Sequence, residues 1–374
     1  MKKNLAVMFG GYSVEHEISV VTALQAIRNI DDKKYNIIPI YLKDGEWFSG
    51  KQLLDVDFYK YDCKAKKISM IPNSKYLYKK GLFLWKYKKI DVALLCFHGY
   101  EGEDGCVQGL LELNRVPYTS SGVTGSALSC DKILFKEVLK GFNIDCVNSV
   151  NFNKNQYYAN QQKHIIIGEN LSYPIVVKPN CLGSSIGISV CKNREELKDA
   201  LDLAFSLDNR VLLEEYCKDM REINCAVMGY DDDIVISELE EPITKNEILS
   251  FENKYLNNQK QGMASATRKI PAEIANTQSQ KIKEIAKFLF NKLELKGVVR
   301  FDFMVTEEKI YLNELNSIPG SLAFYLFEPQ GISYQKMLDK LILWAILDTE
   351  RKSKFIRKFE KTIFTSISLD GIKK

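Results

Sequence analysis

Two stretches decide the fold of this chain: GVVRFDF at residues 297–303 and IYLNELNSIPG at residues 310–320. Both read as β-strands, in which every second side chain lies on the same face. Asp302 comes from the first strand, and Glu314 and Asn316 share a face of the second. Magnesium needs only one or two carboxylates when phosphates and water complete its shell. The pair therefore predicts a site for magnesium and a nucleotide's phosphates, against the alternative of solvated acids on an amphipathic hairpin.

The composition excludes several other classes of protein. The chain has 374 residues, enough for two or three domains, and its net charge of +4 is too small for a generic polyanion binder. No run approaches eighteen apolar residues, and the first strand passes into a Gly-Gly turn instead of a signal-peptide core. Nine cysteines without a Cys-x-x-Cys pair argue against a disulfide framework or a thiolate metal site. We expect a cytoplasmic protein with no nucleic-acid or membrane partner.

Strand and helix signals alternate in the first part of the chain. Strands are predicted at 5–9, 35–41 and 92–97, and a helix at 14–29, which together predict a parallel sheet. The intervening segment 43–89 is rich in Lys and Tyr and reads as an excursion of antiparallel hairpins.

The second part of the chain predicts a mostly antiparallel sheet crossed by helices. The expected strands are 211–214, 222–228, 234–239, 298–305 and 310–315, placed in one sheet. The expected helices are 131–140, 194–204, 271–293 and 334–347.

A Gly/Ser loop between two strands, at residues 174–190, has the chemistry of a phosphate loop. Gly183 lets backbone N–H groups turn toward an anion, Ser184 and Ser185 add hydroxyl donors, and Lys178 places a positive charge at the base. Such loops are common turn material, so this loop predicts phosphate binding only together with other signals.

Several motifs supply those signals, and their order resembles that of the ATP-grasp carboxylate–amine ligases. They are Asp131-Lys132-x-x-x-Lys136, Val177-Lys178-Pro179 with its Gly-Ser-Ser loop, Arg221-Glu222, Arg300-Phe301-Asp302 and Asn313-Glu314-Leu315-Asn316. Within that superfamily, FGGYSVEHEIS at 9–19 and HGYEGEDG at 98–105 resemble the D-alanine–D-alanine ligases. QGLLEL at 108–113 and PYT at 117–119 continue the match.

The resemblance implies an ATP-grasp fold of α/β and α+β class. An N-terminal parallel, Rossmann-like substrate domain at residues 1–126 would precede two α+β subdomains, at 127–217 and 218–374, that hold ATP between them. It also implies a homodimeric ligase that joins two D-amino acids, D-alanine to D-alanine first among them, for peptidoglycan precursor synthesis. The cofactors would be ATP and two Mg²⁺ ions, with Mn²⁺ able to substitute.

The implied reaction has two steps. A carboxylate first attacks the γ-phosphate of ATP to give an acyl phosphate, and the amine of a second amino acid then attacks the acyl carbon. Lys132 and Lys178 would neutralise phosphate charge, and Asp302, Glu314 and Asn316 would hold the metal. The tetrahedral oxyanion would be stabilised by the side chain of Arg300 and the backbone N–H of Gly320.

The resemblance also assigns the substrate contacts. Glu15 would hold the first ammonium group with Ser184 and Tyr255, and His98 would lie over the carboxylate. The nucleotide contacts would be Gly183 and Ser185 in the loop, the segment Glu214, Glu215, Tyr216 and Cys217 at adenine, Glu222 at the ribose, and Lys254 on a closing loop. Each has a simpler alternative: a carboxylate in the first turn of a helix complements its dipole, and a lone histidine after an apolar strand usually packs in the core.

The chain departs from the family after Pro319-Gly320, where it reads SLAFYLFEP at 321–329. The family has a serine there that binds the second substrate's carboxylate. Ser321 or Tyr325 would have to replace it, or the acceptor would be D-serine, D-lactate or another acid; Lys254-Tyr255 favours an amine acceptor over D-lactate. A catalytically silent nucleotide-binding relative is the more distant alternative, which the intact metal and phosphate ligands disfavour.

Overall fold

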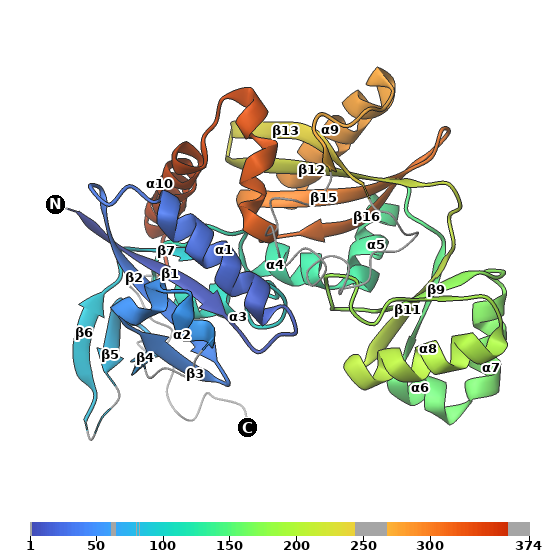
Figure 1. The fold of residues 1–374 in the computed structure, drawn as a ribbon, viewed down its shortest axis with the longest axis horizontal. Coiled ribbons are helices and arrows are strands. Elements are labelled where there is room, and N and C mark those ends of the chain that lie inside the picture. Colours follow the sequence, from blue (N-terminus) through green and yellow to red (C-terminus); the bar gives the residue numbers. More distant parts are fainter. Residues whose placement is uncertain (1, 61–64, 80, 82, 244–267, 358–374) are drawn as a thin grey trace, which may run out of the picture.

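The chain builds three β-sheets, one after another along the sequence (Figure 1). The computed structural model describes residues 2–60, 65–79, 81, 83–243 and 268–357. The predicted site residues Lys254 and Tyr255 therefore lie outside the described residues. No helix in the described ranges is long and apolar enough to cross a membrane.

The first sheet has seven strands in the order β6-β5-β4-β3-β2-β1-β7. The parallel strands are β1 (Lys3–Gly10), β2 (Tyr35–Lys43) and β7 (Val92–Leu95), and α1 (His16–Asn29) connects the first two. The hairpin strands are β3 (Glu46–Ser49), β4 (Lys66–Met70), β5 (Tyr76–Lys79) and β6 (Trp85–Lys89). The predicted parallel sheet and its antiparallel excursion are both confirmed.

The second sheet is antiparallel, in the order β10-β9-β11-β8. Its strands are β8 (Ser149–Asn153), β9 (Ile175–Pro179), β10 (Ser189–Cys191) and β11 (Arg210–Glu215). The prediction that 211–214 joins the strands at 222–315 in one sheet is wrong. Val211 and Leu213 pack with Leu197 in a separate core, and a strand's own pattern cannot say which strands pair with it.

The third sheet is antiparallel, in the order β14-β13-β12-β15-β16. Its strands are β12 (Arg221–Tyr230), β13 (Asp233–Pro242), β14 (Arg268–Lys269), β15 (Gly297–Val305) and β16 (Ile310–Asn316). Phe301 and Phe303 of β15 are fully buried in one core with Leu289 of α9 (Asn276–Lys292). Because strand side chains alternate, Arg300 and Asp302 lie on the opposite face of the sheet, the face away from this core.

Helices cover and connect the sheets. They are α2 (Asp57–Lys60), α3 (Cys106–Leu113), α4 (Val123–Cys130), α5 (Lys132–Gly141), α6 (Lys154–Ala159), α7 (Gln161–Glu169), α8 (Arg194–Leu207) and α10 (Tyr334–Ser353), with 3-10 turns η1 (Lys51–Leu54), η4 (Gly320–Leu326) and η5 (Glu328–Gln330). The helix predicted at 271–293 begins only at Asn276. The long helix α10 contacts β7 of the first sheet and β12 and β15 of the third.

Candidate active site

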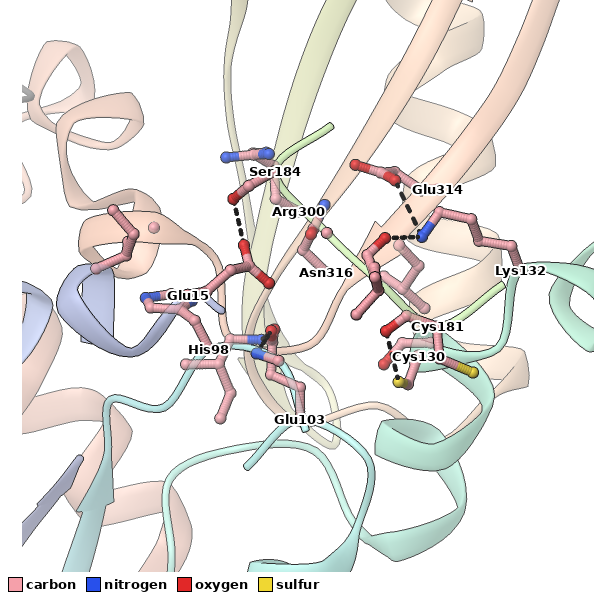
Figure 2. A pocket seen from close by; sticks show the side chains of 18 residues that line it. Glu15, His98, Glu103, Cys130, Lys132, Cys181, Ser184, Arg300, Glu314 and Asn316 are labelled. Carbon is pink, nitrogen blue, oxygen red and sulfur yellow. Dashed lines mark hydrogen bonds and ion pairs between the residues drawn. The ribbon is translucent and has the colours of Figure 1, made fainter. Parts of the chain in front are cut away.

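A cavity of about 100 Å³ lies where elements from all three sheets meet (Figure 2). Nine of the predicted residues line it: Glu15, His98, Lys132, Gly183, Ser184, Arg300, Glu314, Asn316 and Gly320. The other predicted residues within the described ranges do not belong to its wall; they are Lys178, Ser185, Glu214, Glu215, Tyr216, Cys217, Glu222, Asp302 and Ser321. The structure thus brings together residues as far apart in the sequence as Glu15 and Gly320.

Glu15 joins the first sheet to the Gly/Ser loop of the second. It is the N-cap residue of α1, but its side chain makes no capping hydrogen bond. Instead its buried carboxylate accepts a hydrogen bond from the hydroxyl of Ser184 (Figure 2). A Cβ on Gly183 would lie 2.8 Å from the Glu15 carboxylate, so glycine permits this close approach. The contact favours a binding role for Glu15 over a simple complement to the helix dipole.

His98 is a neutral imidazole in the cavity wall. Its Nε2 forms a hydrogen bond of 2.9 Å with Thr22 Oγ1. Burial lowers the pKa of His98 to about 3, and the nearby Arg300 acts in the same direction. At neutral pH it therefore carries no positive charge, and its ring already bonds to Thr22 and to the backbone of Ile318.

Glu103 is a cavity residue to which sequence reasoning assigned no role. Its carboxylate accepts hydrogen bonds from Gly99 N at 2.8 Å and from Ile318 N at 3.1 Å. Burial, with Glu15 nearby, raises its pKa to about 8. The only sequence signal was its place in HGYEGEDG, and its bond to Ile318 spans 215 positions.

The predicted metal ligands share the cavity face of the third sheet. Asp302 pairs in register with Glu314, and Arg300 with Asn316. Arg300 donates two hydrogen bonds to Asp302, from Nε to Oδ1 at 2.6 Å and from Nη2 to Oδ2 at 2.7 Å. Asn316 Nδ2 also donates to Asp302 Oδ2, at 3.0 Å. Burial raises the pKa of Asp302 to about 7 despite Arg300, and Glu314 and Glu222 act in the same direction as burial.

This donor set fits a magnesium ion that shares its ligands with phosphates. Within the described ranges there is no group of three or more His, Cys, Asp or Glu side chains that could hold a metal. Two carboxylates and one amide oxygen are a small set, which suits magnesium because its remaining ligands usually come from water and substrate phosphates. The negative charge that raises the pKa of Asp302 is charge that a divalent cation would neutralise.

Two lysines share one buried carboxylate behind the cavity. Glu214 Oε1 lies 2.6 Å from Lys136 Nζ, and Oε2 lies 2.5 Å from Lys178 Nζ. Burial alone would raise the pKa of Glu214, but the two ammonium groups outweigh burial and lower the pKa to about 2. Lys178 Nζ also donates to Asn313 Oδ1 at 3.1 Å, which ties the second sheet to β16. Sequence reasoning quoted Lys136 in a motif but gave it no role.

Lys132 reaches the cavity directly. Its Nζ donates to the backbone oxygen of Leu182 at 2.6 Å and lies 3.9 Å from Glu314 Oε2. Of the remaining predicted nucleotide residues, Ser185 lies in the loop between β9 and β10, Glu215 ends β11, Tyr216 and Cys217 follow it, and Glu222 lies at the start of β12. Glu215 Oε1 accepts a hydrogen bond of 2.6 Å from Asn148.

The two hydroxyls predicted to replace the family serine point elsewhere. The Ser321 hydroxyl donates to Gln25 Oε1 of α1 at 2.7 Å. The Tyr325 hydroxyl donates to Glu240 Oε2 at 3.1 Å, and the Arg268 guanidinium lies 4.3 Å from the ring centre. Neither residue lines the cavity. Residues 321–323 all have positive φ, between 50° and 53°, which turns this segment toward α1.

Comparisons with known proteins agree with this geometry. The family model described as "D-ala D-ala ligase N-terminus" matches residues 4–121, and "D-ala D-ala ligase C-terminus" matches residues 138–343. The D-alanine–D-alanine ligase of Thermosipho melanesiensis is 44% identical, over 91% of this chain and 92% of the relative. That of Caldicellulosiruptor bescii is 38% identical, over 95% and 98%.

Solved structures show the same fold. The D-alanine–D-alanine ligase from Coxiella burnetii matches with a TM-score of 0.78 at 27% identity, over 94% of this chain and 96% of that chain. The VanG D-Ala:D-Ser ligase from Enterococcus faecalis matches with a TM-score of 0.76 at 29% identity, over 92% and 100%. The family models and the relatives cover most of the sequence, and the chain therefore belongs to the D-alanine–D-alanine ligase family.

Proposed function

We propose that this protein joins D-alanine to D-alanine through an acyl phosphate, using ATP and magnesium, for peptidoglycan precursor synthesis in the cytoplasm. The observation that carries the proposal is that Glu15 and Ser184 line one and the same cavity as Arg300, Glu314 and Asn316. One end of this cavity suits an ammonium group, and the other suits phosphates. The proposal includes a homodimer and domains at 1–126, 127–217 and 218–374.

In the first step, a carboxylate oxygen of D-alanine attacks the γ-phosphorus, and the bond to ADP breaks. The Glu15 carboxylate would hold the ammonium group, and the neutral His98 would lie over the carboxylate. Lys132 would neutralise phosphate charge at the other end of the cavity, where its Nζ already faces Glu314. Asp302, Glu314 and Asn316 would hold magnesium, which would supply positive charge beside the transferred phosphate.

The nucleotide would lie between the second and third sheets. Lys178 would contact phosphate from a position fixed by Glu214 and Asn313. The backbone of 214–217 would meet adenine, and Glu222 would hold the ribose. Gly183 and Ser185 would present the loop to the phosphates, and Lys254 and Tyr255 would close over the site.

In the second step, the amine of the acceptor attacks the acyl carbon, loses a proton, and phosphate leaves. Negative charge develops on the acyl oxygen, and the guanidinium of Arg300 together with the N–H of Gly320 would stabilise it. Asp302 keeps the guanidinium in place through its two bonds, so Arg300 would need little reorganisation during the reaction.

The direct test is phosphate release from ATP with purified protein and D-alanine, with the product identified by mass. D-Serine and D-lactate are assayed as acceptors in parallel, because the chain lacks the family serine and also resembles a D-Ala:D-Ser ligase. D-Alanyl-D-alanine as the main product supports the proposal. If the main product contains D-serine, the acceptor is D-serine instead of D-alanine. If no acid leads to phosphate release, a catalytically silent nucleotide-binding protein is favoured.

Replacing Glu15 with Gln should raise the KM for the first D-alanine by about ten- to a hundredfold. The substitution removes a charged hydrogen-bond partner of the ammonium group, which is worth about 1.5–3 kcal/mol. Initial rates at varied D-alanine would measure the change. Glu17→Gln, an exposed substitution in the same helix, is the control. An unchanged KM in Glu15→Gln would show that this carboxylate does not bind the ammonium group.

Replacing Ser321 with Ala should change the KM for the acceptor less than about twofold, while lowering the free energy of unfolding by about 1 kcal/mol. The reason is that its hydroxyl is bonded to Gln25 rather than directed into the cavity. Urea unfolding and rates at saturating first substrate test the two parts. A five- to hundredfold rise in the acceptor KM, about 1–3 kcal/mol, would instead place the hydroxyl on the acceptor's carboxylate.

A further inference from the structure

Two thiols lie side by side in the cavity wall, near Lys132 (Figure 2). Cys130 is the last residue of α4, and Cys181 follows β9 at the start of the Gly/Ser loop. The thiol of Cys130 donates to the backbone oxygen of Cys181 at 3.8 Å, and the two thiols are close enough to shift each other's pKa. Both side chains are partly exposed free cysteines, so a small molecule in the cavity can reach them.

The surroundings of Cys181 favour its reactive, ionised form. Asn180 Nδ2 donates to its sulfur at 3.2 Å, and the same amide is oriented by Ile133 N, which donates to Asn180 Oδ1 at 2.9 Å. The neighbouring Cys130 thiol lowers the pKa of the Cys181 thiol, and Lys132 acts in the same direction, against burial, Asp208 and Asp131. The Cys181 thiol, together with burial, raises the pKa of Cys130. Since the thiolate is the nucleophile, Cys181 is the residue that reacts first.

We propose that Cys130 and Cys181 form a dithiol site that hydrogen peroxide converts into an intramolecular disulfide. The Cys181 sulfur attacks one peroxide oxygen, the O–O bond breaks, and water leaves with the thiol proton, giving a sulfenic acid. The Cys130 sulfur then attacks the Cys181 sulfur, the S–O bond breaks, and a second water leaves with the Cys130 proton. The two thiols lose two electrons and two protons, and peroxide is reduced to two waters.

The disulfide would fasten the Gly/Ser loop to α4. A disulfide holds its sulfurs about 2.05 Å apart, closer than two thiols that are not bonded, so the loop must move toward Cys130. The adjoining residues are Leu182, which accepts the bond from Lys132, and Gly183, which lies against Glu15. A loop fixed at this point would exclude the nucleotide's phosphates; this consequence rests on the proposed function, whereas the disulfide itself does not.

The chemical step is tested by peptide mapping of the reduced full-length chain after treatment with hydrogen peroxide and alkylation of the remaining thiols. We expect one cross-linked peptide pair containing Cys130 and Cys181, lighter by two hydrogens. Cys106→Ser, which removes an exposed thiol, should keep this pair, and Cys130→Ser should instead accumulate a sulfenic acid on Cys181. Absence of the pair from the parent, or cross-linking of Cys130 mainly to another cysteine, would overturn the proposal.

The effect on the nucleotide is measured separately as ATP affinity before and after peroxide. The oxidised parent should bind ATP at least about tenfold more weakly, about 1.4 kcal/mol, and dithiothreitol should restore binding. Cys181→Ser, compared with its own untreated sample, should be insensitive to peroxide. If a fully cross-linked sample binds ATP with unchanged affinity, the disulfide does not exclude the nucleotide's phosphates. Failure of the reduced parent to bind ATP would contradict the proposed function and leave the peptide map unaffected.

Discussion

Replacing Glu314 with Gln should lower turnover by about a hundredfold or more, while the free energy of unfolding changes by less than about 1 kcal/mol. The substitution keeps the shape of the side chain and removes a negative charge that would bind magnesium beside the phosphates. Glu314 pairs with Asp302 across β15 and β16 and is partly exposed, so folding does not depend on its charge. Turnover and urea unfolding are measured on one preparation.

Glu308→Gln is the matched control for Glu314, because it removes an exposed carboxylate from the turn between the same two strands. It should leave both turnover and stability at the level of the parent. Turnover in Glu314→Gln within about tenfold of the parent would mean that the metal is held elsewhere. Raising magnesium should not restore this variant fully, since the lost group is itself a ligand.

Replacing Glu214 with Gln should lower the free energy of unfolding by about 3–5 kcal/mol, the cost of leaving a buried charge without its partner. The carboxylate lies between the ammonium groups of Lys136 and Lys178, and all three side chains are buried. Activity should fall as well, because Lys178 loses the group that positions it. Glu215→Gln, the next residue along β11, should cost about 1 kcal/mol or less, since it removes only the charge from one exposed hydrogen bond to Asn148.

The stability difference between the parent and Glu214→Gln should also depend on pH. The pKa of Glu214 is lowered from 4.5 to about 2, so the stability that it contributes is fully present above pH 4.5 and is lost as the pH falls toward 2. The difference in unfolding free energy between the parent and Glu214→Gln should therefore shrink between pH 4.5 and 2. A difference that stays constant over this range would show that the carboxylate is not held ionised by the two lysines.

Local patterns in the sequence predicted the parts of the site that depend on one strand or loop. The alternation in GVVRFDF placed Arg300 and Asp302 on one face, and that is sufficient for their two bonds because residues two apart in a strand are neighbours. The Gly/Ser loop was likewise predicted from its composition, and the family motifs selected Glu15, which no pattern would have distinguished from any other acid at a helix start.

The remaining contacts depend on the path of the chain through space. Ser321 bonds to Gln25, which is 296 positions away, and no periodicity relates the two. The partners of Glu214 are Lys136 of α5 and Lys178 of the neighbouring strand β9. The sequence around Glu214 therefore could not predict its role as a buried counter-ion. Cysteine spacing argued against a thiolate metal site but could not reveal that Cys130 meets Cys181.

Glu103 has a mechanical consequence for substrate entry. By accepting bonds from Gly99 and Ile318, its carboxylate fastens the turn after β7 to the segment after β16, and α10 spans the same two sheets. The first and third sheets are thereby braced into one frame. The second sheet meets that frame through polar contacts, among them Ser184 with Glu15, Lys178 with Asn313 and the buried pair of Glu214 with Lys136 of α5. The second sheet is therefore the part that we expect to move when a nucleotide enters; Ser184 would move with it, whereas Glu15 would stay on the frame.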